Sequence, residues 1–446
     1  MSGAGPANGG SDAAGAPFPA AGQGEAGRTI TRRESLGILA ASMLAAASAL
    51  VATVLAARAL DERGTTEFLV FWSLLFGVFG VMAGVQPEAT RAVGAARLRP
   101  RDAGGSAGAR VLPVALGFGA AAALLLVGGA PLWAASFLPT GTGWAVALLG
   151  AGVLLYAGHA AMSGISAGRD QWTLFAVLGG GEALWRLVAM FGVALIAASV
   201  LGLEAAAVSA VLLWVLLTLA CPGARAASRA RADVPAPRLV RNILLSMGSS
   251  ASSAVLMVGF PFVLRVTEGG GLSRDQSVLL GGLILAISIT RSPIMIPLQA
   301  FQGVAISAFL KQRHRPIAAM AKPVGALLGV GALGAALAGS IGPWLFALIY
   351  GPTYDGVIRG GLLAVLTFGS AVMAALVLSG TAVLALDAHR LYVSGWAVAA
   401  LTAIGLLFLP LDLVPRAVAA LYLGPAAGFG VHLAGMRRVV RPPTGR

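Results

Sequence analysis

About twelve long apolar stretches recur along this chain of 446 residues, and they limit its fold more than any other feature. A helix needs about 20 apolar residues to cross a hydrocarbon layer of roughly 30 Å. Helices also satisfy their own backbone hydrogen bonds in lipid, which open strands cannot do. The sequence therefore predicts an all-α integral membrane protein. The predicted spans are residues 36–56, 67–86, 109–132, 143–164, 172–197, 203–220, 242–263, 278–298, 323–349, 361–386, 391–410 and 416–435.

Composition agrees with this interpretation. Hydrophobic residues make up 58% of the chain and charged residues 11%, whereas about a quarter of a typical soluble domain is charged. The net charge is +14, but the basic residues lie in short segments between apolar stretches, which does not favour nucleic acid as a partner. Cys221 is the only cysteine, so an intrachain disulfide and a zinc cluster of cysteines are excluded.

The distribution of basic residues predicts the orientation in the membrane. With an even number of spans and a cytoplasmic N-terminus, 23 of the 31 lysines and arginines lie in cytoplasmic segments and six in outer loops. Cytoplasmic loops of membrane proteins carry such an excess. We therefore expect a multi-pass protein of the inner (cytoplasmic) membrane with both termini in the cytoplasm.

The chain divides into two halves around a polar linker rich in proline and arginine. Residues 1–30 are mostly Gly, Ala, Pro and Ser, a composition that predicts a disordered tail. Residues 31–220 and 242–435 are each expected to form a lobe of six helices, and two such lobes are a common plan for transporters. The linker spans residues 221–241, and residues 436–446 form a basic cytoplasmic tail.

Covalent chemistry is not expected. The predicted loops are too short to hold a catalytic domain, and the chain has no GxxxxGK[ST] phosphate-binding loop. The four histidines, at positions 159, 314, 389 and 432, are far apart in sequence and suggest no metal site. We therefore expect a protein that is not an enzyme and needs no cofactor or metal.

Charged residues inside the spans are the candidate functional residues, because an ionised group in a bilayer usually faces a partner or a wet cavity. Arg291 lies in the eighth span without an acidic residue within one helical turn, and Pro293 and Pro297 follow it. It either lines a substrate cavity or extends to the cytoplasmic interface. Arg186 lies four residues after Glu182. The two either neutralise each other or line a cavity in which Arg186 meets an anion and Glu182 takes part in coupling.

Arg91 follows Glu88 by one helical turn near the inner end of the second span. It is either a cavity residue or an anchor at the cytoplasmic interface. Guanidinium groups suit phosphate, because their planar donors bind two oxygens and stay charged. Arg291, Arg186 and Arg91 together predict an anionic substrate. A cation exporter needs carboxylates inside the membrane, and Glu182 is the only deep one expected.

Three stretches resemble the polysaccharide-export branch of the multidrug/oligosaccharidyl-lipid/polysaccharide (MOP) superfamily, the Wzx or O-antigen type of flippase. The first runs from the end of span one through span two, ATVLAARALDERGTTEFLVFWSLLFGVFGVMAGVQPEATRAV. The second is LIYGPTYDGVIRGGLLAVL, in which Gly351, Pro352 and Tyr354 match a recurrent outer turn. The third is VLSGTAVLALDAHRLYVSGWAV. The first outer turn, LDERGTTEF, departs from the Gly-Pro and aromatic-Gly usual in that family.

This resemblance implies a MATE-like fold of two six-helix lobes around a cavity. It implies transport of a polyprenyl-diphosphate-linked oligosaccharide across the inner membrane by alternating access, with arginines holding the diphosphate. The expected partners are this lipid-linked anionic glycan, membrane lipids, and the glycan polymerase and glycosyltransferases of the same process. Two alternatives stay open: a MATE-type exporter of drugs or organic cations, and a non-transporting scaffold of a cell-wall synthesis complex.

Overall fold

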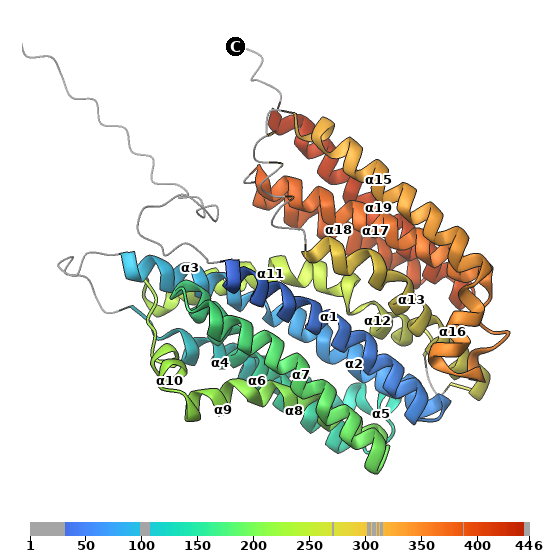
Figure 1. The fold of residues 1–446 in the computed structure, drawn as a ribbon, viewed down its shortest axis with the longest axis horizontal. Coiled ribbons are helices and arrows are strands. Elements are labelled where there is room, and N and C mark those ends of the chain that lie inside the picture. Colours follow the sequence, from blue (N-terminus) through green and yellow to red (C-terminus); the bar gives the residue numbers. More distant parts are fainter. Residues whose placement is uncertain are drawn as a thin grey trace, which may run out of the picture.

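The computed structural model describes residues 32–98, 108–269, 272–300, 315–386 and 388–440, together with Ala305, Phe309 and Gln312. In the described part of the chain, every regular element is a helix, apart from an isolated β-bridge between Arg110 and Arg231. The predicted tail at residues 1–30 lies outside the described residues. Figure 1 shows the helices gathered into two bundles, one from each half of the sequence.

The N-terminal half holds the first six predicted spans. Its helices are α1 (Arg32–Ala59), α2 (Glu62–Met82), α3 (Val85–Leu98), α4 (Val111–Gly129), η1 (Ala130–Leu132), α5 (Ala134–Phe137), α6 (Thr142–Gly168), α7 (Trp172–Ile196), α8 (Val200–Ser209), η2 (Ala210–Leu212) and α9 (Leu213–Ala220).

A short helix, α10 (Pro222–Ser228), lies in the predicted linker, and the C-terminal half follows it. Its helices are α11 (Ala236–Met257), α12 (Phe260–Val266), α13 (Arg274–Ala300), α15 (Pro316–Ser340), α16 (Gly342–Tyr350), η3 (Pro352–Tyr354), α17 (Gly360–Ala385), α18 (His389–Leu407) and α19 (Leu413–Val440). Since α11 begins at Ala236, residues 236–241 of the predicted linker are helical.

The predicted fold class is confirmed. Eleven helices among the described residues are long and apolar enough to cross a membrane, and the bent pair α11 and α12 makes a twelfth if it counts as one span. The two helices meet at an angle of 68°. Gly259 lies in the break between them, and Pro261 lies in the first turn of α12. The orientation of the termini remains a prediction.

Two span limits were wrong. The second span extends from Glu62 to Arg97, not 67–86. It starts early because the Asp61 side chain accepts a hydrogen bond from the Gly64 amide (2.8 Å) and caps the helix. It ends late because α3 continues the span after α2. The ninth predicted span, 323–349, is two helices. Proline is favoured in a first helical turn, so α15 begins at Pro316, and it ends at Ser340 before α16 starts.

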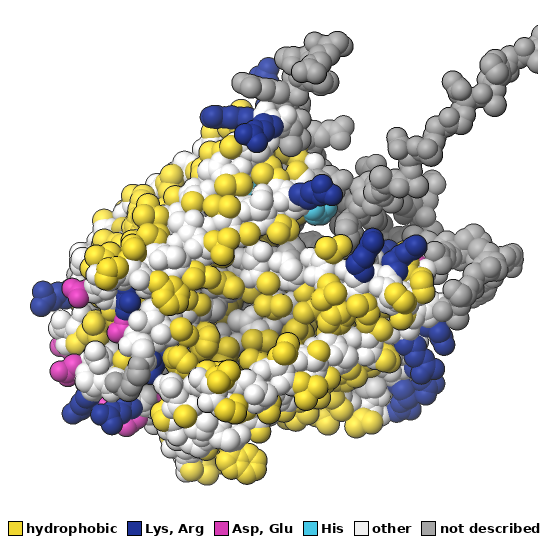
Figure 2. All heavy atoms as spheres, turned by 180° about the vertical axis from the view of Figure 1, so that it is seen from behind, with side chains coloured by type: hydrophobic (Ala, Val, Ile, Leu, Met, Phe, Trp, Pro, Cys, Tyr) yellow, Lys and Arg dark blue, Asp and Glu magenta, His cyan; other side chains and the backbone are white. Residues whose placement is uncertain are grey.

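On the face seen in Figure 2, apolar side chains cover a broad middle region, and charged side chains gather toward the ends. Among the exposed apolar side chains, Leu132, Leu195 and Ile196 are each more than four-fifths exposed. Such surface is what lipid covers in a protein that spans a membrane. We call the end that holds Arg58, Glu62 and Arg274 the outer end, following the orientation predicted from the arginines. The opposite end is the inner end.

The two halves are joined by hydrogen bonds at the outer end. Arg58 donates from Nε to the Ile349 carbonyl (2.7 Å). The Thr66 hydroxyl donates to the Ser277 carbonyl (2.8 Å). Two further contacts lie there: Arg274 donates to Glu62 (2.8 Å) and Arg265 to the Ser136 carbonyl (2.8 Å). The bundles diverge toward the inner end in Figure 1.

The turn at Gly351 is part of this outer end. Gly351 has φ +101°, a conformation that L side chains rarely adopt, and η3 follows it. Tyr354 at the end of η3 is buried and packs edge-on against Phe346. Burial raises the pKa of its hydroxyl to about 12, so this side chain stays neutral at any physiological pH.

Candidate functional site

Arg291 lies between the C-terminal bundle and the break in the seventh span. Its Nη1 donates to the carbonyls of Met257 (2.8 Å) and Leu256 (3.2 Å), the last residues of α11. The break at residues 258–259 leaves carbonyls at the end of α11 without helical partners, and a guanidinium is a natural donor to them. No carboxylate contacts Arg291 within the described residues. Its positive charge is therefore not neutralised.

A small cavity of about 10 Å³ adjoins Arg291 inside the C-terminal bundle, with walls from α13, α17 and α19. Its volume is about that of one water molecule. In this conformation the side chain therefore faces protein and a water-sized space. The cavity is lined by Ile287, Thr290, Arg291, Leu366, Gly369, Ser370 and Leu421.

Arg186 and Glu182 form a buried ion pair on α7. Both side chains are less than a tenth exposed, and the second Glu182 oxygen contacts Nε2 of His159 on α6 at 3.1 Å. The Arg186 guanidinium also lies over the ring of Phe76, 4.9 Å from its centroid. Arg186 thus faces the interior of the N-terminal half, where its charge is balanced by Glu182.

Arg91 and Glu88 belong to a network near the inner end. Arg91 donates to both oxygens of Glu88 (2.6 and 2.8 Å) and to both oxygens of Asp233 in the linker (3.1 and 3.2 Å). Asn242 on α11 donates to Glu88 (3.0 Å). Two carboxylates therefore bind the Arg91 guanidinium, and the network ties α3 to the linker and to α11.

The three arginines do not converge on one point. Their hydrogen bonds, ion pairs and ring contacts in the described part of the chain involve different residues. Arg91 and Arg186 each face carboxylates, whereas Arg291 faces backbone carbonyls. Of the three arginines, Arg291 is thus the one whose positive charge is not neutralised by a carboxylate and is available to an anion.

Sequence reasoning missed two buried carboxyl groups in the N-terminal half. Glu204 on α8 is fully buried, and neither of its oxygens has a hydrogen-bond partner. Glu67 on α2 accepts hydrogen bonds from the amide and hydroxyl of Thr140 (2.7 Å each). Both residues lie within the first two turns of their helices, so Glu182 remains the carboxylate that is predicted to lie deepest in the membrane. An acidic residue inside the apolar run VLGLEAAAV was the available signal.

No group of three or more histidine, cysteine, aspartate or glutamate side chains is placed to hold a metal ion in the residues described. Neither oxygen of the buried Glu204 carboxyl has a hydrogen-bond partner. Because an ionised carboxylate without a partner is costly to bury, this group favours the protonated form or a bound cation. The site chemistry of this fold is thus an unneutralised guanidinium in one half and buried carboxyl groups in the other.

Three relatives of known sequence are similar to this chain over nearly its whole length. The uncharacterized protein Rv1510 of Mycobacterium tuberculosis (strain H37Rv) is 35% identical over 410 residues, which cover 92% of this chain and 93% of the relative. Rv3630 of the same strain and Mb3654 of Mycobacterium bovis are each 32% identical over 422 residues, which cover 94% of this chain and 96% of each relative. No family model matches the sequence.

Solved structures of transporters share the fold. An inward-facing multidrug resistance MATE family transporter of the MOP superfamily superposes with a TM-score of 0.66 at 15% identity, covering 91% of this chain and 98% of the other. Its outward-facing counterpart gives 0.59 at 14% identity, with coverages of 92% and 96%. A MOP superfamily transporter from Pyrococcus furiosus, described as having a binding pocket of reverse polarity, gives 0.61 at 14% identity, with coverages of 92% and 97%. This multi-pass membrane chain therefore belongs to the family of Rv1510, Rv3630 and Mb3654, and its fold is that of MOP superfamily transporters.

Proposed function

We propose that this chain is a transporter that flips a polyprenyl-diphosphate-linked oligosaccharide, a precursor of a cell-surface polysaccharide, across the inner membrane by alternating access. The observation that carries the proposal is the setting of Arg291. It combines a positive charge without an acidic partner with a position beside the broken span α11–α12. Discontinuous helices form substrate sites in many transporters.

Arg291 is suited to a diphosphate for a physical reason. Its present partners are two neutral carbonyl oxygens. A phosphate oxygen forms a charge-assisted hydrogen bond with guanidinium, which is about twice as strong as a neutral one. A diphosphate that reaches this position therefore competes well with the carbonyls of Leu256 and Met257. A change in the bend between α11 and α12 would expose the guanidinium to it.

The arrangement of the two halves supports alternating access. Several hydrogen bonds join the halves at the outer end, and others join α11 and the break after it to the N-terminal half, from Asn242 to Glu88 and from Ser73 to the Val258 carbonyl. The superposition is better with the inward-facing MATE transporter than with the outward-facing one. We infer that the structure represents an inward-facing state, in which a cytoplasmic substrate enters first. Breaking the outer contacts would then accompany release on the other side.

The proposal is tested by substituting Arg291 in a strain that lacks the chromosomal copy. Arg291→Ala should abolish surface glycan export while the amount of protein in the membrane stays the same. Arg291→Lys should retain part of the export, because lysine keeps the charge but binds as a point charge. The readouts are labelled surface glycan and membrane protein level.

Arg437→Ala is the matched control, since it removes an exposed arginine at the inner end of α19. It should leave export unchanged. Normal export in the Arg291→Ala strain would remove this residue from the mechanism. Normal export after removal of Arg291, Arg186 and Glu182 together would instead favour the non-transporting scaffold.

A MATE-type exporter of drugs or organic cations is the second candidate, and the carboxyls of Glu204 and Glu67 favour it. A buried carboxyl without a partner can exchange a proton or bind a cation. This candidate predicts that Glu204→Gln abolishes resistance to cationic drugs and leaves surface glycan unchanged. The lipid-linked glycan candidate predicts instead that loss of Arg291 reduces surface glycan and leaves resistance to cationic drugs unchanged.

A further inference from the structure

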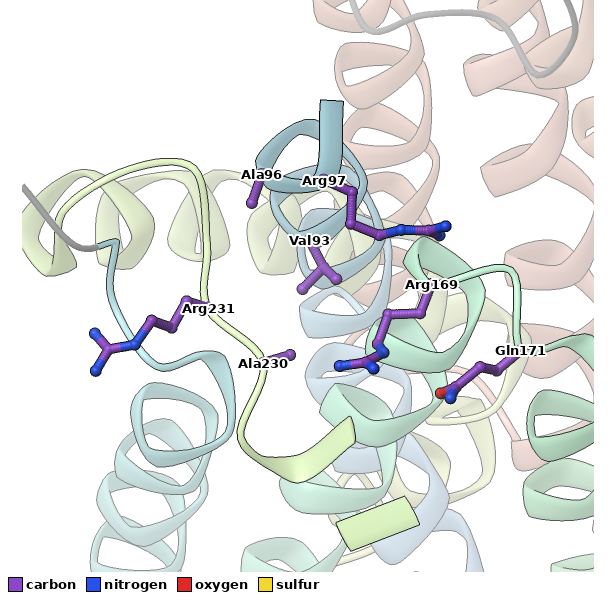
Figure 3. A pocket seen from close by; sticks show the side chains of 7 residues that line it. All are labelled: Val93, Ala96, Arg97, Arg169, Gln171, Ala230 and Arg231. Carbon is purple, nitrogen blue, oxygen red and sulfur yellow. The ribbon is translucent and has the colours of Figure 1, made fainter. Parts of the chain in front are cut away.

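A second charged cavity lies at the inner end of the N-terminal half, away from Arg291. Its volume is about 340 Å³, within the range of roughly 300–1,000 Å³ that small-molecule sites occupy. Three segments form its walls: α3, the turn between α6 and α7, and the linker after α10. It is lined by Val93, Ala96, Arg97, Arg169, Gln171, Ala230 and Arg231 (Figure 3).

Arginine dominates the chemistry of this cavity, which we call the Arg169 pocket. Figure 3 shows the Arg169 guanidinium near Val93 and Ala230, whereas the side chains of Arg97 and Arg231 extend in opposite directions at the two sides of the pocket. Arg97 is paired with Asp170 (2.9 Å).

Arg169 and Arg231 are bound differently. Arg169 donates to the Ala226 carbonyl (3.3 Å) and Arg231 to the Gly108 carbonyl (3.0 Å). Backbone carbonyls orient these guanidinium groups without cancelling their charge, so the pocket carries an excess of positive charge.

Asp233, two residues after Arg231, does not neutralise the arginines of the pocket. The Asp233 carboxylate accepts hydrogen bonds from Arg91, one turn deeper on α3. A buried acceptor does face the pocket lining: Oε1 of Gln171 has no hydrogen-bond partner. It is free to accept a hydrogen bond from a hydroxyl that lies beside a bound anion.

The walls of the Arg169 pocket are held in place before any ligand arrives. Asp170 has φ +56°, the left-handed region, and the turn around it is closed by a hydrogen bond from the Gln171 amide to the Ser166 carbonyl (2.8 Å). On the opposite wall, the Ala232 amide donates to the Ala109 carbonyl (2.8 Å) and the Asp233 amide to the Ala92 carbonyl (3.1 Å). Such preorganisation lowers the entropic cost of binding.

We propose that the Arg169 pocket binds a phosphate-bearing anion at the membrane surface, supplied either as the head group of an anionic lipid or as a soluble phosphate compound. Guanidinium groups bind phosphate oxygens through parallel donors. The pocket lies at the inner end, beside the ends of the apolar spans, and basic residues next to such ends attract anionic lipid head groups. The site is distinct from Arg291 and does not depend on the transported substrate.

The test compares two pairs of substitutions that remove the same charge. Arg169→Gln with Arg231→Gln alters the pocket, whereas Arg225→Gln with Arg229→Gln alters exposed arginines of α10 and its end that do not line it. Purified full-length protein is titrated with phosphatidylglycerol in mixed micelles, with phosphatidylcholine as the uncharged comparison, and separately with inorganic phosphate. Binding is measured by native mass spectrometry and by the shift in unfolding temperature.

Wild-type protein and the Arg225/Arg229 variant should bind alike, and the Arg169/Arg231 variant at least tenfold more weakly. If phosphatidylglycerol alone shows this dependence, the ligand is a lipid head group. If inorganic phosphate shows it too, the ligand is a soluble phosphate. Equal binding by both variants, with both probes, would overturn the proposal. Should the double variant not fold, Arg169→Lys keeps the charge and should weaken binding several-fold, whereas unchanged affinity would also overturn it.

Discussion

Two ion pairs of the N-terminal half join side chains of a single helix, Glu182 with Arg186 on α7 and Glu88 with Arg91 on α3. Spacings of four and three residues made such pairs one of the interpretations that the sequence left open, and both pairs form. The partners from distant segments were not foreseeable: His159, Asp233 and Asn242 reach these pairs from other helices. Only tertiary packing decides such contacts.

The buried pair on α7 gives a prediction about single residues. Arg186→Met leaves Glu182 charged and buried, so the free energy of unfolding should fall by about 3 to 5 kcal/mol. The double substitution Arg186→Met with Glu182→Leu removes both charges and should restore most of that loss. Thermal unfolding of the purified variants measures both effects.

Transport by the stable double variant then separates the two interpretations of this pair. Wild-type transport would mean that the pair only neutralises itself, whereas lost transport in a fully folded double variant would assign it a role in the mechanism. A double variant as unstable as Arg186→Met would contradict the ion-pair account of the single substitution.

At the scale of elements, glycines allow the second and seventh spans to approach closely. A Cβ atom at Gly84 would lie 2.6 Å from the backbone Cα and N of Met247 on α11, nearer than any real contact. A Cβ atom at Gly77 would lie 3.5 Å from Gly259, an ordinary contact. The path of α11 along α2 and α3 therefore depends on Gly84 more than on Gly77.

This difference predicts unequal effects of the same substitution. Gly84→Ala should lower the free energy of unfolding by about 1 to 3 kcal/mol, the usual cost of overpacking. Gly77→Ala should be neutral or slightly stabilising, because alanine favours the helix. Thermal unfolding in detergent compares the two, and equal midpoints would show that α11 does not pack as closely as described.

Hydropathy located every spanning element but not their internal breaks. The spans at 203–220, 242–263 and 323–349 are each divided, at η2, at residues 258–259 and at Ile341. Average hydropathy is insensitive to a break of one or two apolar residues. Hydropathy therefore could not predict the bend at Gly259, which leaves the carbonyls of Leu256 and Met257 free to accept hydrogen bonds from Arg291.

At the scale of the whole molecule, the two-bundle plan followed from the count of spans and from the linker, because membrane helices are long and continuous in sequence. The relation between the bundles did not follow, since it depends on contacts such as that of Thr66 on α2 with Ser277 on α13. Those contacts close the outer end.

A disulfide across that end should stop the transport cycle. A Cβ atom at Gly281 would lie 3.7 Å from the Thr66 Cβ atom, close to the usual separation of about 3.8 Å in disulfides. In a background where the exposed Cys221 is replaced by serine, Thr66→Cys with Gly281→Cys should cross-link and abolish transport. A reducing agent should restore it, and each single cysteine variant should transport throughout. Full transport by the cross-linked protein would contradict alternating access through this end.

The most direct test of the account is flipping by the purified protein in vesicles. Proteoliposomes receive a fluorescent polyprenyl-diphosphate-linked oligosaccharide, and the fraction that reaches the opposite leaflet is measured with a membrane-impermeant quencher. The account predicts rapid flipping by wild type, loss of at least tenfold in rate for Arg291→Ala, and wild-type rates for Arg437→Ala. A wild-type protein that leaves this lipid in place while carrying an organic cation, or an Arg291→Ala variant that flips it at the wild-type rate, would contradict it.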